Sequence, residues 1–228
     1  MRTELIDLAI IPARAGSKGV PRKNSRVLGQ HPLIGWTIRS AILSQRFERI
    51  VVTTDCADIA RIALEYGAEV PFMRPPDLAN DAVGSLEVIN HALFELGNID
   101  TFALLQPTSP FRNAEHMQNA ASAFNGDALV SVSDSKPLSW NFEISSKGYL
   151  NSCIDKQVAT QRQVTNTVVP NGAIYIASRA YFDKSQGFWG DRTQAFVMDQ
   201  ISSWDIDTLS DWLIAEQLVQ SGLRTIDS

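Results

Sequence analysis

The residues most able to do chemistry gather in one short stretch, LAIIPARAGSKGVPRKN, at residues 8–24. The stretch begins as an apolar run and then carries two glycines, two prolines and four cations. Glycine lets a backbone approach a ligand closely, and successive N–H groups can point at one anion. Ser17 adds a hydroxyl group, while Arg14 and Lys18 add a planar fork and a compact ammonium group. The stretch therefore favours a loop that binds a polyphosphate.

The cations of this loop belong to a longer window that contains no acid. No Asp or Glu occurs from residue 8 to residue 47, which hold seven cations, although the formal net charge of the chain is −5. Such a window indicates either a local anion site or a solvated basic face, and its composition alone leaves both open. The net acidity of the chain argues against a nucleic-acid-binding protein.

A second candidate for chemistry is a pair of carboxylates, Asp205 and Asp207, which flank Ile206. In an extended segment, alternation places both carboxylates on one face and turns Ile206 toward the core. Two hard oxygen ligands within about 7 Å suit Mg²⁺, which binds one or two carboxylates plus substrate phosphates. The alternatives are an acidic loop, or a cap for a helix that begins near Leu209, supplied by Asp207 or Thr208.

The elements that must position these groups alternate in type along the first 133 residues. Short apolar runs predict strands at residues 7–13, 49–55, 68–73, 101–107 and 127–133, and amphipathic stretches predict helices at 32–46, 57–67, 84–96 and 113–124. This alternation predicts an α/β fold, a mostly parallel sheet with helices on both faces. Ligands of such sheets bind beyond the carboxyl ends of the strands, where residues 13–24 begin.

The pattern changes after Pro137. We expect a hairpin in residues 138–154 that turns at 146–148, then a polar stretch, a strand at 171–178, extended pieces at 195–199 and 202–207, and a last helix at 209–220. We interpret residues 1–228 as one domain, with about 137–168 as a hairpin insertion. Trp140, Phe142 and Ile144 alternate there, so one face of the hairpin either meets a partner subunit or packs internally.

Several classes of protein are disfavoured by what the sequence lacks. No apolar run approaches the roughly 20 residues that cross a bilayer, so we expect no membrane partner. The two cysteines lack CxxC spacing, so we expect free thiols. The acids near the N-terminus argue against a signal peptide, so we expect a cytoplasmic protein. The P-loop, GxGxxG and GxSxG patterns are absent, and the three histidines have no spacing typical of zinc ligands.

The stretch IIPARAGSKGVPRKN resembles the signature of the CMP-sugar synthetases, the cytidylyltransferases that activate sialic acid and related sugars. Five further segments follow in the order of that family, namely TTD at 53–55, RPPDLANDAVGS at 74–85, LLQPTSPFR at 104–112, PNGAIYI at 170–176 and DIDT at 205–208. The resemblance covers nearly the whole chain. It implies a Rossmann-like sheet of the nucleotide-diphospho-sugar transferase type, with a small β-hairpin dimerisation subdomain and therefore a homodimer.

The resemblance also implies a role for each matching residue. The triphosphate of CTP would be held by Arg14, Ala15, Gly16, Ser17, Lys18 and Asn24; the cytosine by Arg74 and Ser85, with Asp81 organising their loop; the sugar by Gln106, Arg162, Gln163 and Asn171; and Mg²⁺ by Asp205 and Asp207. Arg14, Lys18 and the two aspartates would be the catalytic groups. Without the resemblance, Arg74 reads equally as a surface cation, Gln106 as a loop tether and residues 161–163 as a solvated loop.

The implied reaction is transfer of CMP from CTP to the anomeric hydroxyl of a nine-carbon 2-keto sugar acid, with release of pyrophosphate. Some sialic acid enzymes carry Lys where this chain has Ser139, so legionaminate or pseudaminate is an alternative to N-acetylneuraminate. Two further alternatives are an eight-carbon keto-deoxy acid as acceptor and a non-catalytic nucleotide-binding regulator on the same fold. The group that takes the hydroxyl proton is left open, with Asp205 one candidate.

Overall fold

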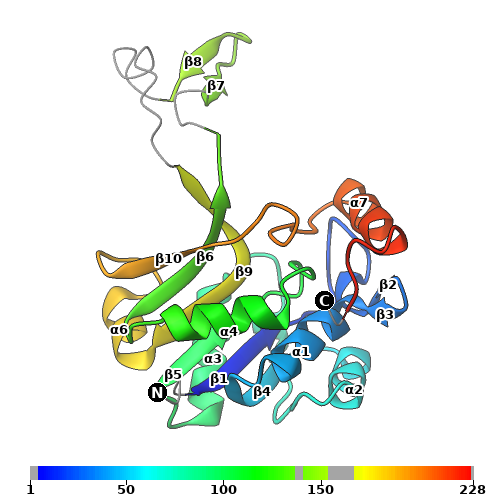
Figure 1. The fold of residues 1–228 in the computed structure, drawn as a ribbon, viewed down its shortest axis with the longest axis vertical. Helices are drawn as coiled ribbons and strands as arrows, with labels where there is room; N and C mark the ends of the chain where they lie inside the picture. The colour runs from blue at the N-terminus through cyan, green and yellow to red at the C-terminus, as the bar shows by residue number, and fades with distance from the viewer. Residues whose placement is uncertain (1–4, 137–140, 154–166, 227–228) are drawn as a thin grey trace.

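A computed structural model describes residues 5–136, 141–153 and 167–226 of the chain. Its centre is a six-stranded sheet in the order β10-β6-β9-β5-β1-β4 (Figure 1). The strands are β1 Ile6–Pro12, β4 Phe47–Thr53, β5 Thr101–Leu104, β6 Ala128–Asp134, β9 Val168–Ser178 and β10 Thr193–Val197. β1 pairs in parallel with β4 and β5, and β10 with β6, whereas β9 runs antiparallel between β5 and β6. The predicted α/β class and mostly parallel sheet are confirmed.

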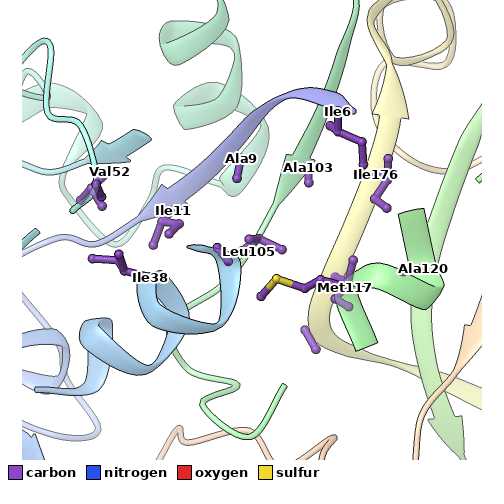
Figure 2. Packing of buried hydrophobic residues seen from close by; sticks show 14 of the residues in the cluster. Ile6, Ala9, Ile11, Ile38, Val52, Ala103, Leu105, Met117, Ala120 and Ile176 are labelled. Carbon is purple, nitrogen blue, oxygen red and sulfur yellow. The ribbon is translucent and has the colours of Figure 1, made fainter. Parts of the chain in front are cut away.

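Helices cover both faces of the sheet, because alternate residues of the central strands point to opposite sides. Ala9 and Ile11 of β1 pack toward α1 Leu33–Ser44, α2 Ala57–Glu65 and α4 Ala114–Ala123 (Figure 2). Leu8 and Ile10 pack on the other side with α3 Ser85–Leu96 and α6 Arg179–Ser185. Strands buried on both faces explain the continuous apolar runs of the sequence.

A third apolar cluster lies apart from the two sheet faces and joins distant parts of the chain. Val20 and Ile206 are both fully buried in it, together with Trp212 of α7 Leu209–Gln220. The remaining buried members come from the short strand β2 Val27–Leu28, from α1, from α7 and from Phe111. The cluster therefore packs the loop after β1 and the segment before α7 against the same helix.

The hairpin predicted after Pro137 is present in the described residues. β7 Phe142–Ile144 and β8 Leu150–Ser152 pair antiparallel, and Gly148 has a positive φ of 81° in the turn between them. Figure 1 shows this pair standing away from the six-stranded sheet. Residues 137–140 and 154–166 of the expected insertion lie outside the described residues.

Three local expectations were wrong. Residues 68–73 form no strand but a single bridge between Glu69 and Val51, since Pro71 cannot donate a backbone hydrogen bond there. Residues 202–207 form a turn followed by irregular chain, whereas the extended piece expected at 195–199 corresponds to the edge strand β10. The seven-residue helix α6 was not expected, although Ser178 caps it by accepting a hydrogen bond from the Tyr181 N–H.

The other small elements lie near the carboxyl end of β1. A 3₁₀ turn spans Lys23–Ser25, another spans Pro76–Leu78, and β2 pairs with β3 His31–Pro32. None of the helices in the described ranges is long and apolar enough to span a bilayer.

Candidate functional site

A cleft of about 230 Å³ opens beyond the carboxyl ends of the parallel strands β1 and β5. Its walls come from four parts of the chain: the loop after β1, the loop that precedes α3, the start of α3, and the loop after β5. The predicted residues that line it are Arg14, Gly16, Ser17, Asn24, Arg74, Asp81, Ser85 and Gln106. Segments that are up to 92 residues apart in sequence (14 to 106) thus face one space.

The loop at residues 13–24 is held in place by its own backbone and by neighbouring side chains. The Ala15 N–H donates to Asp55 Oδ1 at 2.9 Å, and the side chain of the buried Asn24 donates to the Arg14 carbonyl at 3.0 Å. Arg22 adopts a left-handed conformation with φ of 54° as the chain enters the 3₁₀ turn. The loop is therefore shaped before any ligand binds, and Asn24 shapes it from beneath.

Two cations of the loop meet one carboxylate across the cleft. Arg14 Nη2 lies 2.5 Å from Asp81 Oδ1, and Lys18 Nζ lies 2.7 Å from Asp81 Oδ2. These hydrogen bonds, from Lys18 first and Arg14 second, hold the pKa of Asp81 below its usual value. Asp81 thus ties the loop before α3 to the loop after β1.

The aspartate pair lies directly against the same loop. A Cβ atom added at Gly19 would come within 1.8 Å of the Asp207 carbonyl oxygen, so the two backbones touch. Lys23 Nζ donates to the Ile206 carbonyl at 2.6 Å and lies 3.3 Å from Asp207 Oδ1. Residues 13–24 and 205–207 therefore contact each other although Lys23 and Ile206 are 183 positions apart, but Asp205 and Asp207 are not among the residues that line the cleft.

The expected burial of Ile206 is confirmed, whereas Asp205 and Asp207 on either side of it are exposed. Asp205 reaches solvent but lies among protein groups. This partial burial raises its pKa, the hydrogen bond from Thr108 lowers it, and the charge of Asp207 raises it further. The helix cap proposed as an alternative use of this segment is present as well, since Thr208 caps α7 and forms a capping box with Asp211.

Two neighbouring carboxylates that face solvent fit a magnesium ion that also binds phosphate oxygens. Within the described ranges no group of three or more His, Cys, Asp or Glu side chains could hold a metal ion. The pair would therefore need oxygen ligands from substrate or water to complete an octahedral set.

Arg74 occupies a buried position rather than the surface position weighed as its alternative. Its side chain is 5% exposed, and its guanidinium donates to Thr53 through Nε to Oγ1 at 3.3 Å and through Nη2 to the carbonyl at 2.5 Å. Burial lowers the pKa of Arg74 to about 10, which leaves it cationic at neutral pH. Ser85 is the first residue of α3 and lines the cleft together with Arg74.

The residues predicted to bind the sugar differ in their position relative to the cleft. Gln106 lines the cleft, and its Oε1 would lie 2.8 Å from a Cβ at Gly172, whose φ is +76°. Asn171 is 7% exposed, and its amide bonds within the protein: Oδ1 accepts from Ser131 Oγ at 2.5 Å, and Nδ2 donates to Ser203 Oγ at 2.8 Å. These bonds give Asn171 a place in the architecture beneath the cleft, and its contact with a sugar stays a prediction. Arg162 and Gln163 lie outside the described residues.

Sequence reasoning gave no role to three residues that the structure brings to the site. Lys23 was counted as a cation, yet its side chain is only 11% exposed and it, rather than Lys18, reaches the aspartate segment. Thr108 bonds Asp205, and its carbonyl accepts from the Ile206 N–H at 2.9 Å. Asp55 fixes the loop through Ala15. All three residues stand inside segments that carried the resemblance, which was the signal available for them.

Comparison with known proteins agrees with this geometry. A family model described as Cytidylyltransferase matches residues 8–210. The chain is 39% identical over 197 residues to N-acylneuraminate cytidylyltransferase of Escherichia coli O18:K1:H7, covering 83% of this chain and 46% of the relative. It is 39% identical over 196 residues to CMP-N,N'-diacetyllegionaminic acid synthase of Legionella pneumophila, covering 81% of this chain and 83% of the relative. The chain thus spans about half the length of the Escherichia coli relative.

Solved structures share the fold at low sequence identity. CMP:2-keto-3-deoxy-manno-octonic acid synthetase complexed with CTP superposes with a TM-score of 0.71 and 13% identity, over 95% of this chain and 99% of that one. A 4-diphosphocytidyl-2C-methyl-D-erythritol synthase from Anaerococcus prevotii gives a TM-score of 0.65, with 13% identity, over 96% and 99% of the two chains. The family model supplies what these distant structures cannot: the chain belongs to the cytidylyltransferase family, whose members are nucleotidyltransferases.

Proposed function

We propose that the protein transfers CMP from CTP to the anomeric hydroxyl of a nine-carbon 2-keto sugar acid and releases pyrophosphate. The observation that carries this proposal is the contact between the loop at 13–24 and the segment at 205–207, made by Gly19 and Lys23. That contact places a carboxylate pair beside the loop that would bind the phosphates, and nucleotidyl transfer needs these two parts close together.

In this proposal the nucleotide lies along the loop after β1. Arg14, Lys18 and the backbone at Ala15, Gly16 and Ser17 bind its β- and γ-phosphates, because cations and N–H groups converge there. Asn24 supports the loop from within. Arg74 and Ser85, on the opposite wall, bind the cytosine, and Arg74 suits this role because Thr53 holds its guanidinium still.

Asp205 and Asp207 would hold Mg²⁺ together with phosphate oxygens of the bound nucleotide. When bound, the ion would neutralise charge on the phosphates and make the α-phosphorus more electrophilic. Lys23 stands beside the pair and donates to the carbonyl between the two aspartates, so it fixes the direction in which they point. Replacing Asp207 with Asn should therefore suppress the Mg²⁺-dependent turnover and raise the Mg²⁺ concentration that half-maximal turnover requires, and an unchanged dependence on Mg²⁺ would count against Asp207 as a ligand.

The reaction we propose is a single in-line displacement. The anomeric oxygen of the sugar acid forms a bond to the α-phosphorus as the bond to the β-phosphate oxygen breaks, and pyrophosphate leaves with that electron pair. Arg14 and Lys18 stabilise the negative charge that passes to pyrophosphate. Asp205, whose carboxylate accepts a hydrogen bond from Thr108 in the loop after β5, accepts the proton from the attacking hydroxyl. No covalent bond to the protein forms.

The acceptor is inferred from relatives. The names of the similar chains specify N-acylneuraminate, N,N'-diacetyllegionaminic acid and, for a Campylobacter jejuni protein 36% identical over 122 residues, pseudaminic acid. The likeness to the octonic acid synthetase concerns the fold alone, at 13% identity, so an eight-carbon acceptor ranks second. Gln106, Arg162, Gln163 and Asn171 remain the predicted sugar residues.

The test is a panel of sugar acids incubated with CTP and Mg²⁺, with pyrophosphate release measured and the CMP ester identified by mass spectrometry. We expect release with one or more nine-carbon acids. Binding of CTP without release for any acid in the panel would refute catalysis and favour the regulator. Faster turnover with an eight-carbon acid would instead overturn the proposed acceptor.

We also propose that the hairpin pairs two copies of the chain. Phe142 and Ile144 on β7 are 50% and 76% exposed, and Tyr149 and Leu150 across the turn are 71% and 66% exposed. Apolar side chains gathered on a projecting pair of strands favour a partner of the same kind. Sedimentation of the wild type should give a dimer, and Ile144→Asp should shift it toward the monomer. A wild-type monomer at micromolar concentration would contradict this.

A further inference from the structure

We infer that Asp81 occupies the place of a phosphate in the nucleotide-free protein, and that a nucleotide gains Arg14 and Lys18 only by displacing it. The inference rests on the proposed function for the identity of the ligand, a polyphosphate. It assigns Asp81 a role in selecting ligands by their number of phosphates, beyond holding its loop in shape.

The geometry is that of an anion bound by two cations. Each carboxylate oxygen of Asp81 contacts a different cation, Oδ1 to Arg14 at 2.5 Å and Oδ2 to Lys18 at 2.7 Å. A phosphate oxygen pair would make the same two contacts. Arg14, Asp81 and the loop backbone at Gly16 and Ser17 line one cleft, so a phosphate bound there would compete with the carboxylate.

The turn that presents Asp81 is built to hold it in this position. The Asn80 side chain donates to the Asp77 carbonyl at 2.8 Å and accepts from the Ala82 N–H at 2.9 Å, bonds that close the backbone around Asp81. Asp81 is 67 residues away from Arg14 in sequence, so the contact belongs to the fold and not to local chain geometry.

The other cations of the site are bound to groups that a ligand cannot displace. Lys23 donates to the Ile206 carbonyl and Arg74 to the Thr53 carbonyl, both parts of the backbone. Arg14 and Lys18, in contrast, are 31% and 83% exposed at their side chains, and their shared partner is a side chain that is 42% exposed. Exposed ion pairs are weak, so a ligand can break this one readily.

The exchange discriminates between ligands by charge. A diphosphate or triphosphate offers oxygens to both Arg14 and Lys18 at once and replaces both contacts of Asp81. The CMP ester that remains after pyrophosphate leaves has a single phosphate, and Asp81 can then close again on both cations. Asp81 would thus lower the affinity for a polyphosphate more than the affinity for the product, and it would favour the release of pyrophosphate.

The experiment measures the affinity of inorganic pyrophosphate, CMP and cytidine by isothermal titration calorimetry. The proteins are the wild type, Asp81→Asn, Asp81→Ala and the control Asp77→Asn, which changes an exposed acid of the same loop. Two exposed ion pairs predict a gain in pyrophosphate affinity of about three- to ten-fold for both Asp81 variants. We expect a smaller gain for CMP, and no change for cytidine or for Asp77→Asn.

Equal or weaker pyrophosphate binding by both Asp81 variants would overturn the inference, as would binding too weak to measure in every protein. An equal gain for Asp77→Asn would also overturn it, because a general change in loop charge would then suffice. The outcome is separable from the proposed function. Absence of pyrophosphate release with every sugar acid would refute catalysis, while tighter pyrophosphate binding by the Asp81 variants would still support the exchange.

Discussion

The loop at residues 13–24 has two halves that differ in what holds them. The outer half, residues 13–18, carries Arg14 and Lys18, whose shared partner is the exposed carboxylate of Asp81. The inner half, residues 19–24, is anchored by three of its members, although Arg22 is exposed: Val20 is fully buried, Gly19 touches the Asp207 backbone, and Asn24 is 8% exposed. Twelve consecutive residues thus combine a part that can change partners with a part that cannot.

This difference between the two halves assigns ligand binding to the outer half and the positioning of the reacting groups to the inner half. Side chains that meet a mobile polyanion gain from weak, exchangeable partners, because a strong internal partner would have to be broken each time. Groups that set the distance between phosphate and carboxylates gain from rigid packing, since an error of about 1 Å in a reacting geometry costs on the order of 100-fold in rate. Substitutions in the inner half should therefore cost more activity than substitutions in the outer half.

The largest effect is expected for Gly19→Ala. The new methyl group would lie 1.8 Å from the Asp207 carbonyl oxygen, so the loop and the aspartates must move apart. We expect kcat for pyrophosphate release to fall at least about 100-fold. Gly16→Ala, whose methyl group would meet nothing within 4 Å, should leave the melting temperature unchanged and serves as the steric control. Near-normal kcat in Gly19→Ala would show that the contact is not needed.

The next effect concerns Lys23, the positioning cation of the inner half. Lys23→Met keeps the buried stem but removes the donor to the Ile206 carbonyl and the charge beside Asp207. A lost hydrogen bond from a charged group predicts a fall in kcat of about 10- to 100-fold. The KM for CTP should change less than kcat. A raised KM with unchanged kcat would assign Lys23 to binding and erase the distinction between the two halves.

Lys18→Ala tests the outer half and should cost less. Its ammonium group is 83% exposed, so its loss should lower kcat/KM about 10-fold and leave the melting temperature within error of the wild type. The matched comparison is Lys23→Met under the same conditions. A larger loss for Lys18→Ala than for Lys23→Met would invert the comparison, and near-normal pyrophosphate release would remove Lys18 from the catalytic groups.

The smallest effect concerns salt and pH. The pKa of Asp81 is lowered in the folded protein, so its pairing with the two cations is complete above its usual pKa and is lost only as the pH falls through the lowered value. Between pH 5 and 9 the affinity ratio of Asp81→Asn to wild type for pyrophosphate should therefore be flat. Raising the NaCl concentration should bring this ratio toward one, because salt screens the attraction between exposed charges, with a screening length of about 10 Å at 0.1 M salt. A ratio that varies with pH but not with salt would contradict the ion-pair account.

Most of the fold followed from local patterns in the sequence. Continuous apolar runs predicted β1, β4, β5 and β6, because strands buried on both faces need apolar residues at every position. One failed prediction overlooked a local signal: residues 68–73 resemble a strand in composition, yet Pro71 limits them to one bridge. The antiparallel direction of β9 between β5 and β6 depends on the path of the whole chain and has no local signal.

The candidate site also has features that the sequence predicts and features that it does not. The alternation of Asp205, Ile206 and Asp207 foretold the burial of Ile206, since only that side chain can contribute to an apolar cluster. The shared use of Asp81 by Arg14 and Lys18 could not be foretold, because it joins loops 67 positions apart whose charges suit many partners. The sequence likewise could not distinguish Lys23 from the other cations of the loop, because its hydrogen bond to the Ile206 carbonyl depends on the tertiary fold.

The apolar cluster of Val20, Ile206 and Trp212 has a consequence for how the chain acquires its activity during synthesis. The glycine-bearing loop emerges from the ribosome early, but the helix that seats it, Leu209–Gln220, emerges nearly 200 residues later (Val20 to Trp212). A nascent chain can therefore complete its sheet before the helix that packs against the loop has been synthesised. Proteolysis between Asp199 and Leu209 would silence the protein without touching a single residue of the loop, and a separately supplied C-terminal peptide that restores turnover would reveal that dependence directly.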